Sequence, residues 1–317
     1  MSTPSSAGNP EIVCIGEPMY EFSQLPDDRQ RWLQGFGGDT ANAAVAAARQ
    51  GARVAYYTRL GDDEFGREFL ALWRTEQVDA SAVQIDKDAH TAAYFVSHGP
   101  QGHVFSYLRK GSAASRMRPA DLPLELIRGA RFLHASGISQ AISADACDTV
   151  FAAVDAARSA GVQVSYDTNL RLRLWPLPRA RAVIEASMAQ CDVLFMSIEE
   201  GELLCGNSES ERVLAWCHGR GARRVALKLG AQGVIGSDGQ RSVNVPGHAV
   251  QAVDATGAGD CFAGSFLARL AAGDDFWEAL RYANAAAALT CTGYGAVAPL
   301  PRPEAVRRLL DEAAAKR

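Results

Sequence analysis

Short apolar runs alternate with longer amphipathic stretches along most of the chain, and this alternation indicates the fold class. In the segment 39–50, apolar residues recur at helical spacing, and Gly51 follows as a stop. Apolar runs that predict buried strands lie at 11–15, 54–58, 132–135, 162–166, 193–196 and 225–228. Strands separated by helices of about 10–15 residues predict an α/β fold with a mostly parallel sheet and helices on both faces.

One segment breaks the alternation. Residues 91–108 contain two strand-like runs on either side of a turn at 98–102, with no helix between them. We therefore predict a hairpin there and assign it, with the segment 17–34, to a small β lid. Such a lid would cover the carboxyl ends of the parallel strands, where sheets of this kind bind ligands. The polar residues 1–10 predict a disordered tail, and 11–317 contains neither a repeat nor a linker, which predicts a single domain.

Composition narrows the class of protein. The chain has 317 residues, 48 % of them apolar, and a net charge of −4 with no long run of Lys or Arg, so we expect no nucleic-acid partner. Neither a signal pattern nor an apolar run of about 18 residues is present, which predicts a cytoplasmic protein without membrane contact. Seven cysteines without a CxxC pair argue against a disulfide framework.

The sharpest motif is the segment 254–260, DATGAGD, which we expect to follow a strand at 249–253 and to open a helix. Glycines at 257 and 259 let the backbone turn with its amides exposed, and amides at a helix N-terminus bind anions. We predict that the amides of Gly257, Ala258 and Gly259 hold a transferring phosphoryl group. Asp260, in the first turn, would accept the proton of the attacking hydroxyl.

The segment 254–273 resembles the C-terminal signature of the ribokinase-like (PfkB) sugar kinases. The N-terminal counterpart is present as GGDTANAA at 37–44, followed by GDDEFG at 61–66, so the resemblance covers nearly the whole chain. It implies a three-layer α/β/α ribokinase-like fold with a mostly parallel central sheet and a β-strand lid. It also implies ATP and Mg²⁺ as cofactors.

Further positions follow from the resemblance one at a time. Residues 228–233 resemble the loop beside the ATP phosphates and ribose, and Asn284 resembles an adenine-side residue. Many members carry Asn-x-x-Glu where this chain has Ser197 and Glu200, and Asn169 lies in a turn of the family's Asp-x-Asn type. The implied nucleotide site is Ser197, Lys228, Gly230, Gly233, Gly257, Gly259 and Asn284. Glu200 and Asn169 are expected to support Mg²⁺ through water.

Within the family, the subgroup that phosphorylates 2-keto-3-deoxygluconate fits best, on the segments 37–44, 91–94, 105–114 and 167–175. Arginine suits the carboxylate of a sugar acid because it forms paired hydrogen bonds. The expected acceptor site is Gly38, Asp39, Asn42, Tyr94, Tyr107, Arg109, Arg171 and Asp260, with Arg173 and Lys110 as solvated neighbours. The partners are therefore a small sugar acid and ATP, and a homodimer or higher oligomer can form through the lid.

Two alternative functions stay open and a third is excluded. A family member acting on fructose, ribose or a nucleoside is the nearest, and a sugar-binding homologue without catalysis is another. A dehydrogenase is suggested by GYGAVA at 293–298, which matches G-x-G-x-x-A. We exclude it because Pro299 follows at once, where the dinucleotide motif needs a helix.

Overall fold

The computed structural model describes residues 8–25, 28–99 and 102–315. Residues 1–7 of the expected disordered tail, and part of the expected turn at 98–102, lie outside the described residues. Within the described ranges no helix is both long and apolar enough to cross a membrane.

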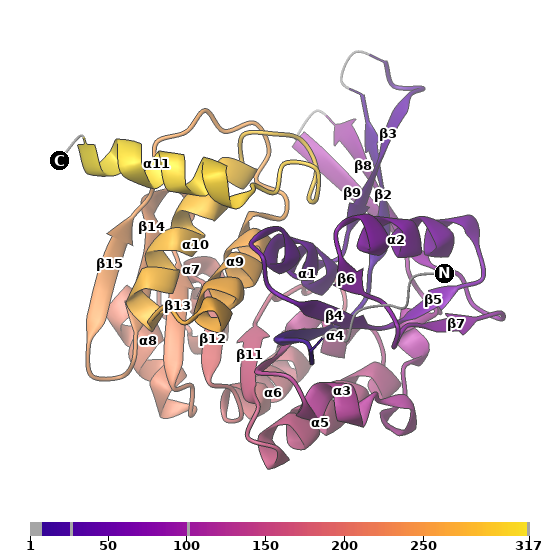
Figure 1. Ribbon diagram of the computed structural model, residues 1–317, viewed down its shortest axis with the longest axis horizontal. Helices are drawn as coiled ribbons and strands as arrows, with labels where there is room; N and C mark the ends of the chain where they lie inside the picture. Colours follow the sequence, from indigo (N-terminus) through magenta and orange to yellow (C-terminus); the bar gives the residue numbers. More distant parts are fainter. Residues whose placement is uncertain (1–7, 26–27, 100–101, 316–317) are drawn as a thin grey trace.

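A central sheet runs through the body of the molecule (Figure 1). Seven of its strands are parallel, and the last two form an antiparallel hairpin at one edge. The strand order across the sheet is β15 (Ser242–Pro246), β14 (Gly233–Ser237), β13 (Arg224–Lys228), β12 (Val193–Ser197), β11 (Gln163–Asp167), β10 (Phe132–Ser136), β1 (Ile12–Ile15), β4 (Val54–Tyr57) and β6 (Val78–Asp79). The predicted α/β class with a mostly parallel sheet is confirmed.

Helices cover both faces of this sheet. Successive residues of a strand point to opposite sides, so the apolar strands place apolar side chains on both faces. In β1, Ile12 and Cys14 belong to one apolar core, and Val13 and Ile15 belong to the other. The helices of the first core are α1 (Asp39–Arg49), α2 (Glu64–Thr75), α9 (Ala258–Ala272), α10 (Phe276–Thr290) and α11 (Pro303–Ala315). Those on the other face are α3 (Leu124–Arg128), α4 (Gly137–Ala141), α5 (Ala144–Ser159), α6 (Leu177–Met188), α7 (Ile198–Cys205) and α8 (Ser210–Gly219).

Helices α1 and α9 pack unusually closely, and this contact helps to form the site. A Cβ at Gly264 of α9 would lie 2.1 Å from the Ala43 carbonyl oxygen of α1, so only glycine fits there. Ala43 and Ala46 present small side chains on the facing side. The N-terminal turns of the two helices are thereby brought together, with Asn42 opposite Asp260.

A separate four-stranded sheet projects from the body as a lid (Figure 1). Its order is β3 (Trp32–Gly37), β2 (Met19–Gln24), β8 (Ala92–Gly99) and β9 (Gly102–Leu108). The β2 and β8 strands pair in parallel, and the two outer pairings are antiparallel. A further small sheet pairs β5 (Arg59–Gly61) with β7 (Gln84–Asp86).

The expected strand at 249–253 is wrong. Residues 247–257 form an irregular connection from β15 to α9, and Val253 is 44 % exposed. The physical reason is that the end of the segment bonds to the residue after α10 and does not pair with the free side of β15, where the described sheet ends. Its backbone is held instead by the Cys291 carbonyl oxygen, which accepts from the amides of Val253 and Asp254 at 2.7 and 3.2 Å.

Candidate active site

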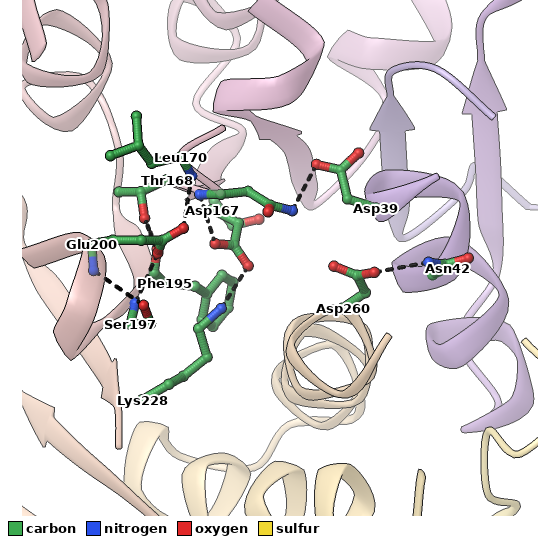
Figure 2. A network of polar contacts seen from close by, with 12 residues as sticks. Asp39, Asn42, Asp167, Thr168, Leu170, Phe195, Ser197, Glu200, Lys228 and Asp260 are labelled. Carbon is green, nitrogen blue, oxygen red and sulfur yellow. Dashed lines mark hydrogen bonds and ion pairs between the residues drawn. The ribbon is translucent and has the colours of Figure 1, made fainter. Parts of the chain in front are cut away.

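A cavity of about 890 Å³ lies between the lid, the N-terminus of α9 and the carboxyl ends of β11–β13. Figure 2 shows its floor, where Asp39 and Asp260 come from one side and Lys228 and Asp167 from the other. Parallel strands direct their carboxyl ends to one edge of the sheet, which is where this cavity opens.

The segment 254–260 forms the anion-binding turn at the N-terminus of α9. Gly257 adopts the left-handed conformation, with φ of 77°, and is the N-cap of the helix. Asp254 holds the turn in shape by accepting from the Thr256 amide at 2.9 Å and from the Gly295 amide at 3.0 Å. Gly257 and Gly259 line the cavity, whereas the Ala258 amide, predicted to bind phosphate, donates to the Ala255 carbonyl oxygen at 3.2 Å. The amides of the two glycines are therefore the candidates to bind an anion.

Lys228 adds a positive charge beside this turn. A Cβ built on Gly259 would lie 3.2 Å from the Lys228 Nζ atom, so the ammonium group lies against the glycine. The same Nζ donates to Asp167 Oδ2 at 2.9 Å. Burial disfavours the charged amine, but the carboxylates of Asp167 and Glu200 outweigh it and raise the pKa of Lys228. A cation next to exposed amides is suited to a phosphate group.

Asp260 lies at the bottom of the cavity, partly open to it. Its Oδ2 atom accepts from Asn42 Nδ2 at 2.8 Å. Burial, and then the nearby charge of Asp39, raise the pKa of Asp260 to about 7, although the hydrogen bond from Asn42 and the charge of Lys228 act in the opposite direction. A carboxylate with a pKa near neutrality can accept a proton more readily than an ordinary aspartate.

This pKa gives a prediction for the pH dependence of activity. The base must be ionised, so kcat/KM for the acceptor should rise with pH, with a midpoint near pH 7. Asn42→Ala removes a hydrogen bond that favours the ionised form, so the midpoint should move to higher pH, whatever happens to the maximal rate. An activity that is flat with pH through this range would show that Asp260 does not titrate in the rate-limiting step.

Glu200 is the centre of a cluster that holds the loop after β11. Its Oε1 accepts from the Leu170 amide at 2.7 Å, and its Oε2 accepts from the Thr168 hydroxyl at 2.7 Å and the Ser197 amide at 2.9 Å. Ser197 is the N-cap of α7 and accepts from the Glu200 amide, which completes a capping box. Ser197 and Glu200 therefore cap α7 together, with serine at the position where the resemblance implied asparagine.

The polar groups around Asp39 form the acceptor side of the cavity. Asn169 has φ of 33°, and its Nδ2 donates to Asp39 Oδ2 at 3.0 Å. Among the described residues, Asp39 Oδ1 and Asn42 Oδ1 are shielded atoms without a hydrogen-bond partner. Buried acceptors of this kind are costly when unpaired, and sugar hydroxyls would supply the missing donors after a small adjustment. Gly38, with φ of 100°, lines the same wall, where a Cβ would clash with the Glu17 carbonyl oxygen.

Two of the predicted acceptor residues already have acidic partners. Arg109 pairs through Nη2 with Glu17, which also accepts from the Ser112 hydroxyl. The Tyr94 hydroxyl donates to Glu21, a buried residue of β2. Both side chains line the cavity, and Arg109 Nε is without a partner within the described part of the chain. The acidic partners were not foreseen because Glu17 and Arg109 are 92 residues apart and meet only through lid pairing.

Arg171, Arg173 and Tyr107 also line the cavity. Arg171 is half exposed, lies 3.8 Å from Glu200, and donates through Nη1 to the Leu170 carbonyl oxygen at 2.9 Å. Arg173, expected to be a solvated neighbour, donates to the backbone of the lid. Asp167 and Arg173 are thus site residues that sequence reasoning left out, although both belong to the segment 167–175 that it singled out.

The remaining predicted residues are divided between this cavity and other parts of the fold. The lining of this cavity includes Ser197, Gly230, Gly257, Gly259 and Asn169, but not Ala258, Gly233 or Asn284. Gly233 allows β14 and β15 to lie close together, because a Cβ at this position would lie 2.1 Å from the Val245 carbonyl oxygen. Asn284 donates to the Pro246 carbonyl oxygen at 2.8 Å, next to a second cavity of about 730 Å³ between β15, α10 and α11.

Known proteins resemble this chain over almost its full length. A relative described as probable fructokinase-2 of Arabidopsis thaliana is 34 % identical, with 92 % of each chain covered. The 2-dehydro-3-deoxygluconokinase of Thermoproteus tenax is also 34 % identical, with 94 % of each covered. A solved ribokinase-type structure from E. coli, in complex with ATP and Mg²⁺, is 26 % identical with a TM-score of 0.88, covering 96 % of this chain and 99 % of that one.

These likenesses and the fold define an ATP-dependent carbohydrate kinase. The chain belongs to the pfkB family of carbohydrate kinases, whose model matches residues 9–303. The two curated relatives, which act on different sugars by their names, are equally similar to it and do not distinguish the acceptor.

Proposed function

We propose that the enzyme transfers the γ-phosphoryl group of ATP to the primary hydroxyl of 2-keto-3-deoxygluconate, giving 2-keto-3-deoxy-6-phosphogluconate. The observation that carries the proposal is the division of charge within the cavity. Asp39 and Asp260 lie on the α1–α9 side, whereas Arg109 and Arg171 come from the lid and the loop after β11. A sugar acid has hydroxyls for the first side and a carboxylate for the second.

Arg171 is best suited to bind that carboxylate. The charge of Arg109 is already balanced by Glu17, so its free Nε can donate to a keto or carboxyl oxygen but brings little net charge. Arg171 has a loose contact to Glu200 and donates through the same Nη1 atom to the Leu170 carbonyl oxygen at 2.9 Å, which leaves its Nη2 and Nε atoms to bind an acceptor carboxylate. Tyr94 and Tyr107, whose ring centroids are 6.2 Å apart, form an apolar wall for the carbon chain.

The reaction then follows from the floor of the cavity. Asp260 accepts the proton of the primary hydroxyl as the oxygen bonds to the γ-phosphorus, and the bond from that phosphorus to ADP breaks. The amides of Gly257 and Gly259 and the Lys228 ammonium hold the transferring group and its developing charge. Phosphoryl transfer needs little covalent help, so placing these groups is the main contribution of the protein.

The nucleotide is proposed to lie over Lys228 and Gly230, with Gly233 and Asn284 shaping the loop and helix on its base side. Mg²⁺, when bound with ATP, neutralises phosphate charge. Among the described residues no group of three His, Cys, Asp or Glu is arranged to hold a metal ion. Both carboxylate oxygens of Glu200 accept hydrogen bonds from neighbouring protein groups. These observations fit a metal held mainly by phosphate and water, with Glu200 and Asn169 outside its direct ligands.

Fructose is the second candidate acceptor, because a fructokinase relative is as similar as the sugar-acid kinase. The test is a panel of acceptors, comprising 2-keto-3-deoxygluconate, gluconate, fructose and ribose, each incubated with Mg-ATP while ADP is measured. We expect 2-keto-3-deoxygluconate to have the highest kcat/KM by at least about tenfold, the value of one charge-assisted hydrogen bond. A preference for fructose would replace the sugar acid with the second candidate, and no ADP with any acceptor would favour a binding protein.

The lid offers a surface for self-association. Trp32, Val104 and Leu108 are 38 %, 50 % and 52 % exposed, and the strand register places them on one face of the lid sheet. Exposed apolar patches are typical of interaction sites. We propose a homodimer through this surface. Light scattering with gel filtration would detect it as twice the chain mass, and Val104→Glu should return the protein to the monomer.

A further inference from the structure

Arg173 connects the loop after β11 with the lid strand β9. Its Nη1 atom donates to the Phe105 carbonyl oxygen at 3.2 Å. Phe105 lies in β9 of the lid, and Arg173 lies in the loop between β11 and α6, 68 residues away. The contact is exposed to solvent, and both residues line the cavity.

The loop that carries Arg173 is firmly held on the body. Leu170 and Trp175, on either side of the arginine, are 6 % and 4 % exposed and belong to the core beneath the sheet. Glu200 accepts from the Leu170 amide at 2.7 Å, and this contact holds the start of the loop. Arg173 therefore extends from a rigid base.

The outer part of the lid is held much less firmly. β9 is an edge strand of the lid sheet, so part of its backbone faces away from β8 and is open to other donors. Val104 and Leu108 of β9 are about half exposed. The lid core comprises four buried side chains, Met19, Ala92, Tyr94 and Val96, with Phe105 packed partly against it.

The base of the lid has a different kind of attachment. Arg109, just after β9, pairs with Glu17, just before β2, and the Glu17 side chain is fully buried. A buried pair of this kind is costly to break, so it acts as a permanent joint. The exposed bond from Arg173 to the Phe105 carbonyl is weak enough to open and close.

We propose that Arg173 is a reversible latch that holds lid strand β9 over the acceptor cavity. The acceptor enters when the bond to the Phe105 carbonyl is open, and the bond re-forms once the acceptor is in place, which slows its escape and excludes water from Asp260. Arg173 is thus a positioning residue. The kinetic consequence rests on the proposed kinase function, but the latch itself concerns any acceptor, acidic or neutral.

The test begins without substrate. Arg173→Met keeps the length of the side chain but removes its donors, and Arg179→Met, an exposed arginine at the start of α6, is the matched control. Hydrogen exchange of the backbone amides of residues 104–108 reports opening of β9. One exposed hydrogen bond predicts that exchange rises by about 2- to 10-fold in Arg173→Met, with no change at α5 in the body. Arg173→Lys, which keeps a donor and a charge, should restore part of the protection.

Kinetics supply the second measurement. Arg173→Met should lower kcat/KM for the acceptor by about 2- to 10-fold through a higher KM, with the KM for ATP unchanged, and to the same extent for any acceptor that the enzyme uses. Unchanged exchange at residues 104–108 would overturn the latch, whatever the kinetics show. Increased exchange in a protein that prefers fructose would support the latch and reject only the sugar-acid acceptor.

Discussion

Replacing Asp260 with asparagine is expected to lower kcat by about 10²–10⁴-fold, because the attacking hydroxyl would lose its general base. The substitution keeps the size of the side chain and an oxygen that can accept from Asn42. It also removes the carboxylate charge of Asp260, whose pKa is raised to about 7 by burial and by the nearby charge of Asp39. Folding should therefore be unaffected or slightly more stable, because repulsion between two carboxylates is relieved.

The measurements are steady-state kcat with Mg-ATP, ATP affinity by calorimetry, and Tm. Asp145→Asn, an exposed aspartate in the first turn of α5, is the control for an aspartate-to-asparagine change at a helix start. We expect Asp260→Asn to bind ATP normally, since the amides and Lys228 that face the phosphates remain. A variant that kept more than half of the wild-type kcat would show that another group takes the proton.

Local patterns were sufficient to predict the general fold. Helix α1 was predicted at 39–50 and runs over Asp39–Arg49, because its apolar spacing agrees with its burial against β1 and α9. The segment 249–253 shows where the same reasoning fails. Its residues are apolar enough for a strand, but the amides of Val253 and Asp254 bond to the Cys291 carbonyl oxygen after α10 and not to the free side of β15. A local pattern does not specify that distant partner.

The site was predictable as far as its groups lie within one motif. The turn at 254–260 contains both its own amides and Asp260, so spacing alone indicated an anion site with a base. The pairs Arg109–Glu17 and Lys228–Asp167 join residues 92 and 61 positions apart. Such partners depend on strand register and lid packing, which a single sequence does not specify. The unexpected partner of Arg109 changes how the acceptor site must be tested.

Arg109→Ala is a poor test of acceptor specificity for that reason. It would leave Glu17, whose side chain is fully buried, without its cation, and losing one partner of a buried pair costs about 3–5 kcal/mol of stability. Lost activity would then report loosening of the lid as much as loss of a substrate contact. Arg171 is half exposed and lies 3.8 Å from Glu200, which keeps its hydrogen bonds from Thr168, Leu170 and Ser197 when the arginine is removed.

Arg171→Ala is expected to lower kcat/KM for 2-keto-3-deoxygluconate by about 10–100-fold, the value of one charge-assisted hydrogen bond of roughly 1.5–3 kcal/mol. Activity on fructose should change by less than about threefold, because a neutral sugar has no carboxylate for the guanidinium to bind. Arg171→Lys should recover only part of the loss, since lysine keeps the charge but not the paired geometry. Arg179→Ala controls for removing a positive charge near α6. Equal losses on the acid and on fructose would show that Arg171 serves the loop after β11 or the phosphates. The acceptor would then be assigned only from the measured kcat/KM values of the different sugars, and the sugar-acid proposal would lose the observation that carries it.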